Sequence, residues 1–132
     1  MTAPLTLADL VGAWTLRDAV VIGDDGARSH PYSTQPSGTL LYTPDGWMSA
    51  TISSVGDEPT PGATYYAGLV DVDGTVVTHT VVVGAGPFGP GTVQPRQAEL
   101  SPDGARLTLT TPPGQVVRTS IRLTWQRAVR PT

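Results

Sequence analysis

The stretch that decides the fold runs from residue 64 to residue 83 and reads TYYAGLVDVDGTVVTHTVVV. Asp73-Gly74 lies near its centre, between two runs rich in valine, threonine and tyrosine, which are residue types that favour strands. An Asp-Gly pair between such runs is a strong signal for a tight β-hairpin turn. We therefore predict two antiparallel strands, at residues 64–72 and 75–83.

Similar turn sequences recur on both sides of this hairpin. Residues 43–46 (TPDG) and 101–104 (SPDG) have proline second and glycine last, as type I turns prefer. Each of these turns predicts a hairpin between the apolar runs that flank it. The remaining strands are expected at residues 14–22, 38–42, 47–53, 92–100, 106–111 and 116–126.

About eight strands joined by short turns predict an all-β fold. Closing such a meander into a barrel removes its exposed edges. We therefore predict one domain over residues 1–132, an antiparallel up-and-down β-barrel of about eight strands. Thr6 and Asp9 have the spacing of a capping pair and predict a short N-terminal helical turn that ends before Gly12. An eight-stranded barrel is either filled by side chains or holds one small ligand.

Alternation along the strands indicates which side chains look inward. In the last strand Ile121, Leu123 and Trp125 share the apolar face, whereas Arg122 shares the polar one. Both faces of residues 75–83 are largely apolar, so periodicity leaves the inward face of that strand open.

Composition excludes several kinds of chemistry. The chain has no cysteine and, because all eight basic residues are arginine, no lysine. Thiol nucleophiles, zinc–thiolate sites and Schiff-base catalysis are therefore excluded. Two histidines without ligand spacing predict no metal and no cofactor. A net charge of −3 with scattered arginines predicts no nucleic-acid and no membrane partner. The N-terminal segment lacks the pattern of a signal peptide, so we expect a cytoplasmic location.

Several segments share motifs with one family. Residues 12–14 (GAW) have the Gly-x-Trp signature of lipocalins, and residues 42–50 read YTPDGWMSA. With matching pieces near residues 77–79, 107–112 and 123–127, the chain resembles the bacterial lipocalin-like domain family. The resemblance implies an eight-stranded barrel with one closed and one open end. It also implies structural roles for Trp14, which would plug the closed end, and for Arg127, which would stack on it.

Candidate chemical groups are few. His79 is the sole histidine on a predicted strand, and with Tyr42 it is the candidate for acid–base catalysis, because histidine titrates near neutrality. The alternative is that His79 is a hydrogen-bonded barrel residue. An inward Arg96 needs a partner, either an ion pair with Glu99, Asp18 or Asp71, or a substrate oxygen. The candidate ligand-binding residues are Trp47, Met48, Tyr65, Tyr66, Phe88, Arg96 and Trp125.

Adjacent residues of a strand point to opposite faces, so at most one of Tyr65 and Tyr66 lines the cavity. Aromatic side chains with a few polar groups are typical of small-molecule sites. The sequence therefore predicts a small hydrophobic organic metabolite as the partner, with a homodimer left open. In the first hypothesis the barrel is a cofactor-free cyclase or isomerase of a polyketide- or terpenoid-like natural product. In the second it is a non-catalytic binding or carrier protein, and in the third a filled barrel with an interaction role.

Overall fold

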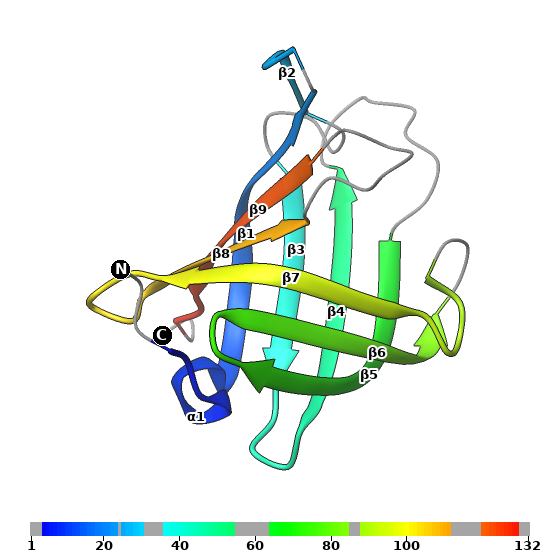
Figure 1. The fold of residues 1–132 in the computed structure, drawn as a ribbon, viewed down its shortest axis with the longest axis vertical. Helices are drawn as coiled ribbons and strands as arrows, with labels where there is room; N and C mark the ends of the chain where they lie inside the picture. Colours follow the sequence, from blue (N-terminus) through cyan, green and yellow to red (C-terminus); the bar gives the residue numbers. More distant parts are fainter. Residues whose placement is uncertain are drawn as a thin grey trace.

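The computed structural model describes residues 4–23, 25–30, 36–54, 64–84, 88–111 and 120–129. Within them, one short helix precedes a series of antiparallel strands (Figure 1). The elements are α1 (Leu7–Leu10), β1 (Gly12–Ile22), β2 (Arg28–Ser29), β3 (Pro36–Tyr42), β4 (Trp47–Ser54), β5 (Thr64–Asp73), β6 (Val76–Gly84), β7 (Val93–Leu100), β8 (Arg106–Thr111) and β9 (Ser120–Arg127).

The strands form a closed barrel. Their order in the sheet follows the chain from β3 to β9, and β1 pairs with both β3 and β9. The pairing of β1 with β9 runs from Trp14↔Arg127 to Ile22↔Ser120 and completes the ring. Eight strands make the barrel, while the two-residue β2 pairs only with the end of β1. In Figure 1, β5 to β8 cross in front of β1, β3 and β4 at a steep angle. The predicted eight-stranded antiparallel barrel is confirmed.

The predicted turns join the predicted strands. Gly74 has a φ of 62° in the hairpin between β5 and β6, and Gly46 has a φ of 92° between β3 and β4. These are left-handed backbone conformations that glycine adopts at low cost. The N-terminal turn is also present, because the backbone N–H of Thr6 donates to Asp9 Oδ2 over 2.8 Å in front of α1.

The start of β3, the short strand β2 and the alternation along β1 differ from the prediction. β3 begins at Pro36, two residues early, and β2 lies in a segment expected to be a loop. β9 begins at Ser120, and residues 112–119, where an earlier start was expected, lie outside the described residues. In β1 the register to β9 shifts between Leu16 and Asp18. This β-bulge interrupts the alternation, so that Ala19 is buried beside Val20.

One buried tryptophan, Trp14, fills the closed end of the barrel. Trp14 is fully buried, and its Nε1–H donates to the carbonyl oxygen of Leu10 over 2.9 Å. The Arg127 guanidinium lies over the Trp14 ring, with Cζ 4.2 Å from the ring centroid. It also donates to the carbonyl oxygens of Asp9, Val11 and Gly104 over 2.9, 2.9 and 3.1 Å. The contact that the family resemblance implied between Trp14 and Arg127 is therefore present.

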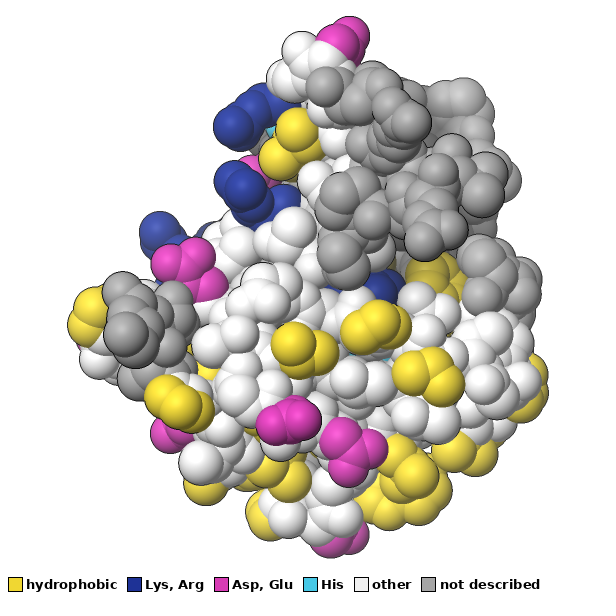
Figure 2. All heavy atoms as spheres, in the orientation of Figure 1, with side chains coloured by type: hydrophobic (Ala, Val, Ile, Leu, Met, Phe, Trp, Pro, Cys, Tyr) yellow, Lys and Arg dark blue, Asp and Glu magenta, His cyan; other side chains and the backbone are white. Residues whose placement is uncertain are grey.

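In residues 75–83, the sequence did not show which face points into the barrel. The structure shows that it is the face of Val77, His79 and Val81, which are all buried. The outward face leaves Val76 and Val82 exposed. Figure 2 shows hydrophobic side chains in separate spots among polar ones over the face formed by β5, β6 and β7. Among the described residues, no helix has the length and apolar character needed to cross a membrane.

Candidate functional site

The interior of the barrel contains a cavity of about 60 Å³. It lies between side chains from β3 to β9 and the turn that carries Phe88. Most of its wall is aliphatic or aromatic, and no acidic side chain of the described residues contributes to it. The lining residues are Leu40, Ala50, Ile52, Thr64, Tyr66, His79, Phe88, Arg96, Leu109, Thr111, Ile121, Leu123 and Trp125.

One histidine between two tyrosines forms the polar centre of the site. The Oη of Tyr42, on β3, lies 2.7 Å from His79 Nε2. The Oη of Tyr66, on β5, lies 2.8 Å from His79 Nδ1. All three side chains are buried. Both ring nitrogens of His79 are therefore hydrogen-bonded to phenol groups.

These two contacts fix the direction of the hydrogen bonds. A neutral imidazole has one N–H donor and one acceptor nitrogen. Tyr42 is buried, and His79 is its one hydrogen-bond partner in the described part of the chain. The Tyr42 O–H is satisfied there only by donating to Nε2, since a buried hydroxyl without a partner is costly. His79 Nδ1 then carries the proton and donates to Tyr66, whose own O–H points away from the imidazole.

The surroundings of His79 and Tyr42 keep both of these side chains uncharged. Burial, together with the Arg96 guanidinium, lowers the pKa of His79 to about 3. Burial also raises the pKa of Tyr42 well above its ordinary value; nearby Tyr66 adds to this increase and Arg96 opposes it. The imidazole and the Tyr42 phenol are therefore both neutral at neutral pH.

Arg96 brings a positive charge to the cavity wall. It follows Pro95 on β7, and its side chain faces inward between the exposed residues Pro95 and Gln97. Its Nη1 donates to the Pro95 carbonyl oxygen over 2.9 Å, and its Nη2 donates to Gln94 Oε1 over 3.1 Å. No carboxylate of the described residues pairs with it, so the predicted ion pairs with Glu99, Asp18 and Asp71 are not found there. Burial lowers the pKa of the guanidinium, and the nearby phenols of Tyr66 and Tyr42 oppose this change.

Unlike Arg96, the indole N–H of Trp125 has no hydrogen-bond partner in the described part of the chain. Trp125, on β9, is 1% exposed and lines the cavity. Its Nε1–H makes no hydrogen bond, whereas the indole of Trp14 donates to a backbone carbonyl. Trp125 therefore lines the cavity while its own Nε1–H is buried and has no acceptor among the described residues.

Phe88 covers one side of the site. Its ring stacks on Tyr66, with the centroids 5.0 Å apart and the planes 18° apart. Gly84 makes this close packing possible, because a Cβ at that position would lie 2.1 Å from the Phe88 carbonyl oxygen. The turn that carries Phe88 thus rests directly on the end of β6.

Comparison with known proteins identifies the barrel. A lipocalin-like protein from Bacteroides uniformis matches with a TM-score of 0.55 and 18% identity, over 91% of this chain and 99% of that one. A family model described as lipocalin-like domain matches residues 11–68. The chain therefore has a lipocalin-like barrel fold, and its residues 11–68 are similar to the lipocalin-like domain. A mutant of the fluorescent protein UnaG also matches, with a TM-score of 0.48 and 12% identity, over 95% of this chain and 100% of that one. A search of curated proteins finds no significant match.

The lipocalin-like barrel brings five of the predicted site residues to its cavity, namely His79, Tyr66, Phe88, Arg96 and Trp125. All five lie on inward positions of their strands or, for Phe88, on the turn after β6. They surround the cavity together with the apolar side chains.

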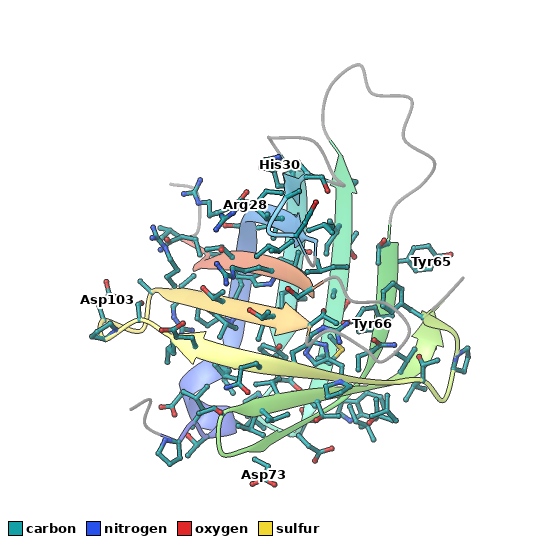
Figure 3. The ribbon with its side chains drawn as sticks, turned by 45° about the horizontal axis from the view of Figure 1, so that its top comes forward. Arg28, His30, Tyr65, Tyr66, Asp73 and Asp103 are labelled. Carbon is teal, nitrogen blue, oxygen red and sulfur yellow. The ribbon has the colours of Figure 1, made fainter. Side chains whose placement is uncertain are left out.

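The other predicted residues lie elsewhere. Tyr42 is behind His79 and does not line the cavity, and Met48 is buried in the core outside its wall. Trp47 and Tyr65 are on the outer face, 46% and 52% exposed. Figure 3 shows Tyr65 pointing away from the barrel and Tyr66 pointing into it, as strand alternation requires. The cavity site therefore includes neither Trp47 nor Tyr65, which were expected to bind the ligand.

The predicted ligand-binding residues include no aliphatic side chain of the wall, although alternation placed Ile121 and Leu123 on an inward face. Leu40, Ile52, Leu109 and Leu123 line the cavity, and alternation alone would have found them as inward residues. Gln94, which accepts from Arg96, gave no signal that separates it from a surface glutamine. Within the described residues, no group of three or more histidine, aspartate or glutamate side chains is arranged to hold a metal ion.

Proposed function

We propose that the cavity binds a small, largely apolar organic metabolite and catalyses its cyclisation or isomerisation without a cofactor. The observation that carries this proposal is the hydrogen-bonded series Tyr42–His79–Tyr66, of which His79 and Tyr66 line a cavity with otherwise mostly apolar walls. Such reactions rearrange bonds without gaining or losing atoms, so they need a shaped dry space and a positioned hydrogen-bond donor.

In this proposal Tyr66 is the group that contacts the substrate. Its Oη accepts a hydrogen bond from His79 Nδ1–H, which polarises the phenol and strengthens its own O–H as a donor. The Tyr66 O–H would stabilise negative charge that develops on a substrate oxygen. His79 and Tyr42 act through Tyr66. The low pKa of His79, about 3, means that the imidazole orients and polarises Tyr66 rather than storing a proton.

The size of the cavity sets how a ligand enters. About 60 Å³ is small beside the roughly 300–1,000 Å³ of pockets for drug-sized molecules. We propose that the Phe88 ring moves aside on binding, because it lines the cavity and its stack on Tyr66 covers the group proposed to contact the substrate. The ring stack would then be replaced by contacts between Tyr66 and the ligand.

A carrier function is the second candidate. It is favoured by the pKa of His79, which leaves this imidazole a weak base at neutral pH. In that case the same cavity would bind the metabolite and release it unchanged. A cytoplasmic location and a homodimer stay predictions under both functions.

The test is a titration of the protein with apolar polyenes, terpenoids and long-chain lactones, followed by tryptophan fluorescence and by mass spectrometry of the recovered ligand. Saturable binding with a product of unchanged mass and altered retention is the result expected of a cyclase or isomerase. Saturable binding with unaltered ligand would favour the carrier. If no member of the panel binds, the cavity has no role of this kind.

A matched pair of variants sharpens this test. Tyr66→Phe should lower kcat at least tenfold while ligand affinity changes less than threefold, because only a hydroxyl is removed. Tyr65→Phe makes the same chemical change on the outer face and should alter neither quantity. Equal turnover in all three proteins would exclude Tyr66 from the chemistry.

A further inference from the structure

Two donor groups of the cavity wall are incompletely matched by the described residues: the Trp125 indole has no acceptor there, and the Arg96 guanidinium has no anionic one. Trp125 Nε1–H makes no hydrogen bond. Arg96 donates only to neutral oxygens of its own strand, from Pro95 and Gln94. Both side chains line the same cavity of about 60 Å³. The site thus offers hydrogen-bond donors and positive charge that the described residues leave uncompensated.

The state of Trp125 is exceptional within this molecule. Buried polar groups in proteins nearly always have a hydrogen-bond partner, and those that do not call for a specific explanation. Trp125 Nε1 is the one buried side-chain nitrogen or oxygen without a partner among the described residues. Its burial is nearly complete, at 1% exposure, and it borders the cavity. An acceptor supplied by a bound molecule would satisfy it.

The positive charge of Arg96 indicates that the bound molecule is negatively charged. A guanidinium remains protonated at neutral pH and presents a planar set of N–H donors suited to two oxygens of one group. Within the described part of the chain, the lining residues include no aspartate or glutamate, and His79 and Tyr42 are held neutral. A partly buried cation in these surroundings favours an anion, because its own charge is otherwise unpaired in a medium of low polarity.

We propose that the ligand of this barrel is an apolar acid whose delocalised oxyanion, a carboxylate or the enolate of a 1,3-dicarbonyl, is held by Arg96 and by Trp125 Nε1–H. This inference rests on the proposed binding of an apolar metabolite and specifies the polar end of that molecule. A group with two acceptor oxygens meets both donors in one small cavity. The apolar body of the acid lies against the aliphatic wall.

The test compares acids with neutral molecules of the same shape by isothermal titration calorimetry at pH 8. Octanoate is paired with octanamide, and dimedone, an acidic 1,3-diketone, is paired with its neutral methyl enol ether. At least one acid should bind tenfold or more tightly than its neutral counterpart. A preference confined to octanoate identifies a carboxylate ligand, and one confined to dimedone identifies an enolate. Equal binding within both pairs overturns the proposal.

Variants assign the preference to the guanidinium. Arg96→Gln should reduce the acid-to-neutral ratio to less than threefold while the neutral molecules bind as before. Arg122→Gln is the matched control, because Arg122 is an exposed arginine on the outer face of β9. If Arg96→Gln keeps the full preference, Arg96 does not hold the anion.

A measurement on the wild-type protein tests the proposal even if the Arg96→Gln variant does not fold. In a ¹⁵N–¹H spectrum the preferred acid should move the indole N–H signal of Trp125 downfield. The signals of Trp14, which is already hydrogen-bonded, and of the exposed Trp47 should stay in place. Binding of the acid without movement of the Trp125 signal overturns the role of that indole.

These results are separable from the proposed function. If acids and neutral molecules bind equally, the barrel still binds apolar metabolites and the inferred anion site alone fails. If none of the four probes binds, the anion site is overturned, and the fluorescence titration of the apolar panel decides the proposed function by itself.

Discussion

His79 connects the polar side chains in the interior of the barrel. It is a buried imidazole that hydrogen-bonds two phenols and lies near a guanidinium. Removal from water and a nearby positive charge both disfavour the imidazolium. The folded protein therefore holds this histidine neutral at pH values where the same side chain in the unfolded chain takes up a proton.

This difference predicts a pH dependence of stability. The pKa of His79 falls from 6.5 to about 3 on folding, so the unfolded chain binds the extra proton between these values. Above about pH 6.5 the titration of His79 does not affect the free energy of unfolding. As the pH falls from 6.5 toward 3, proton uptake by the unfolded chain lowers this free energy. Its slope is at most about 1.4 kcal/mol per pH unit.

Urea unfolding between pH 7.5 and 5 measures this effect. The wild type should lose more stability over this range than His79→Gln, which does not titrate. His30→Gln, at an exposed position, should behave like the wild type. Identical slopes for the wild type and His79→Gln would contradict the assigned state of His79.

Tyr42→Phe should lower stability as well as any activity. The Tyr42 hydroxyl is buried and donates to His79 Nε2. Its removal leaves a buried acceptor unpaired, which costs roughly 1–3 kcal/mol. The free energy of unfolding from urea titration at pH 7.5 checks this. A loss below about 0.5 kcal/mol would argue against this hydrogen bond.

At the scale of elements, the turn after β6 should depend on Gly84. A Cβ there would meet the Phe88 carbonyl oxygen at 2.1 Å and the Tyr66 Cβ at 3.0 Å, so the backbone carrying Phe88 must shift. Gly84→Ala should therefore change ligand affinity at least threefold while the barrel remains folded. Val83→Ala, at the exposed neighbouring position, is the control and should leave affinity unchanged. Unaltered affinity in both variants would show that this turn does not form part of the site.

The closed end is a second element whose strength can be measured. Arg127 joins α1, the start of β1 and the turn before β8 through three carbonyl oxygens and the Trp14 ring. Lysine lacks the planar set of donors that makes these contacts together. Arg127→Lys should cost about 1–3 kcal/mol in urea unfolding, whereas Arg106→Lys, at an exposed position, should cost almost nothing. Equal losses in the two variants would refute the role of Arg127 in closing the barrel.

For the whole molecule, the strand pairing could be predicted from local signals. Turn sequences such as Asp73-Gly74 and alternation along each strand specify hairpins, and neighbouring hairpins specify the order of the sheet. The bulge after Leu16 had no such signal, because an extra residue in one strand depends on its partner across the sheet. Alternation therefore failed where Ala19 and Val20 are both buried.

The site was predictable only in part. Both faces of the strand that carries His79 are apolar, so its sequence did not show that His79 points inward. The way in which the strands close into a barrel determines this direction. Trp47 and Tyr65 were expected at the ligand because aromatic residues are typical of binding sites, yet their strand positions direct them outward. The contacts of His79 with Tyr42 and Tyr66 join residues 37 and 13 positions apart, and such pairings depend on the register of three strands.

The pairing of β1 with β9 affects the rates at which the barrel folds and unfolds. The hairpins join residues close in the chain, whereas Thr15 and Gln126 at this junction are 111 positions apart. Bringing such distant segments together costs the most chain entropy, so we expect this junction to form after the rate-limiting barrier of folding. Weakening it should speed unfolding and leave the refolding rate nearly unchanged. The lifetime of the closed barrel, and with it the retention of any enclosed molecule, is then set along this one line of backbone hydrogen bonds.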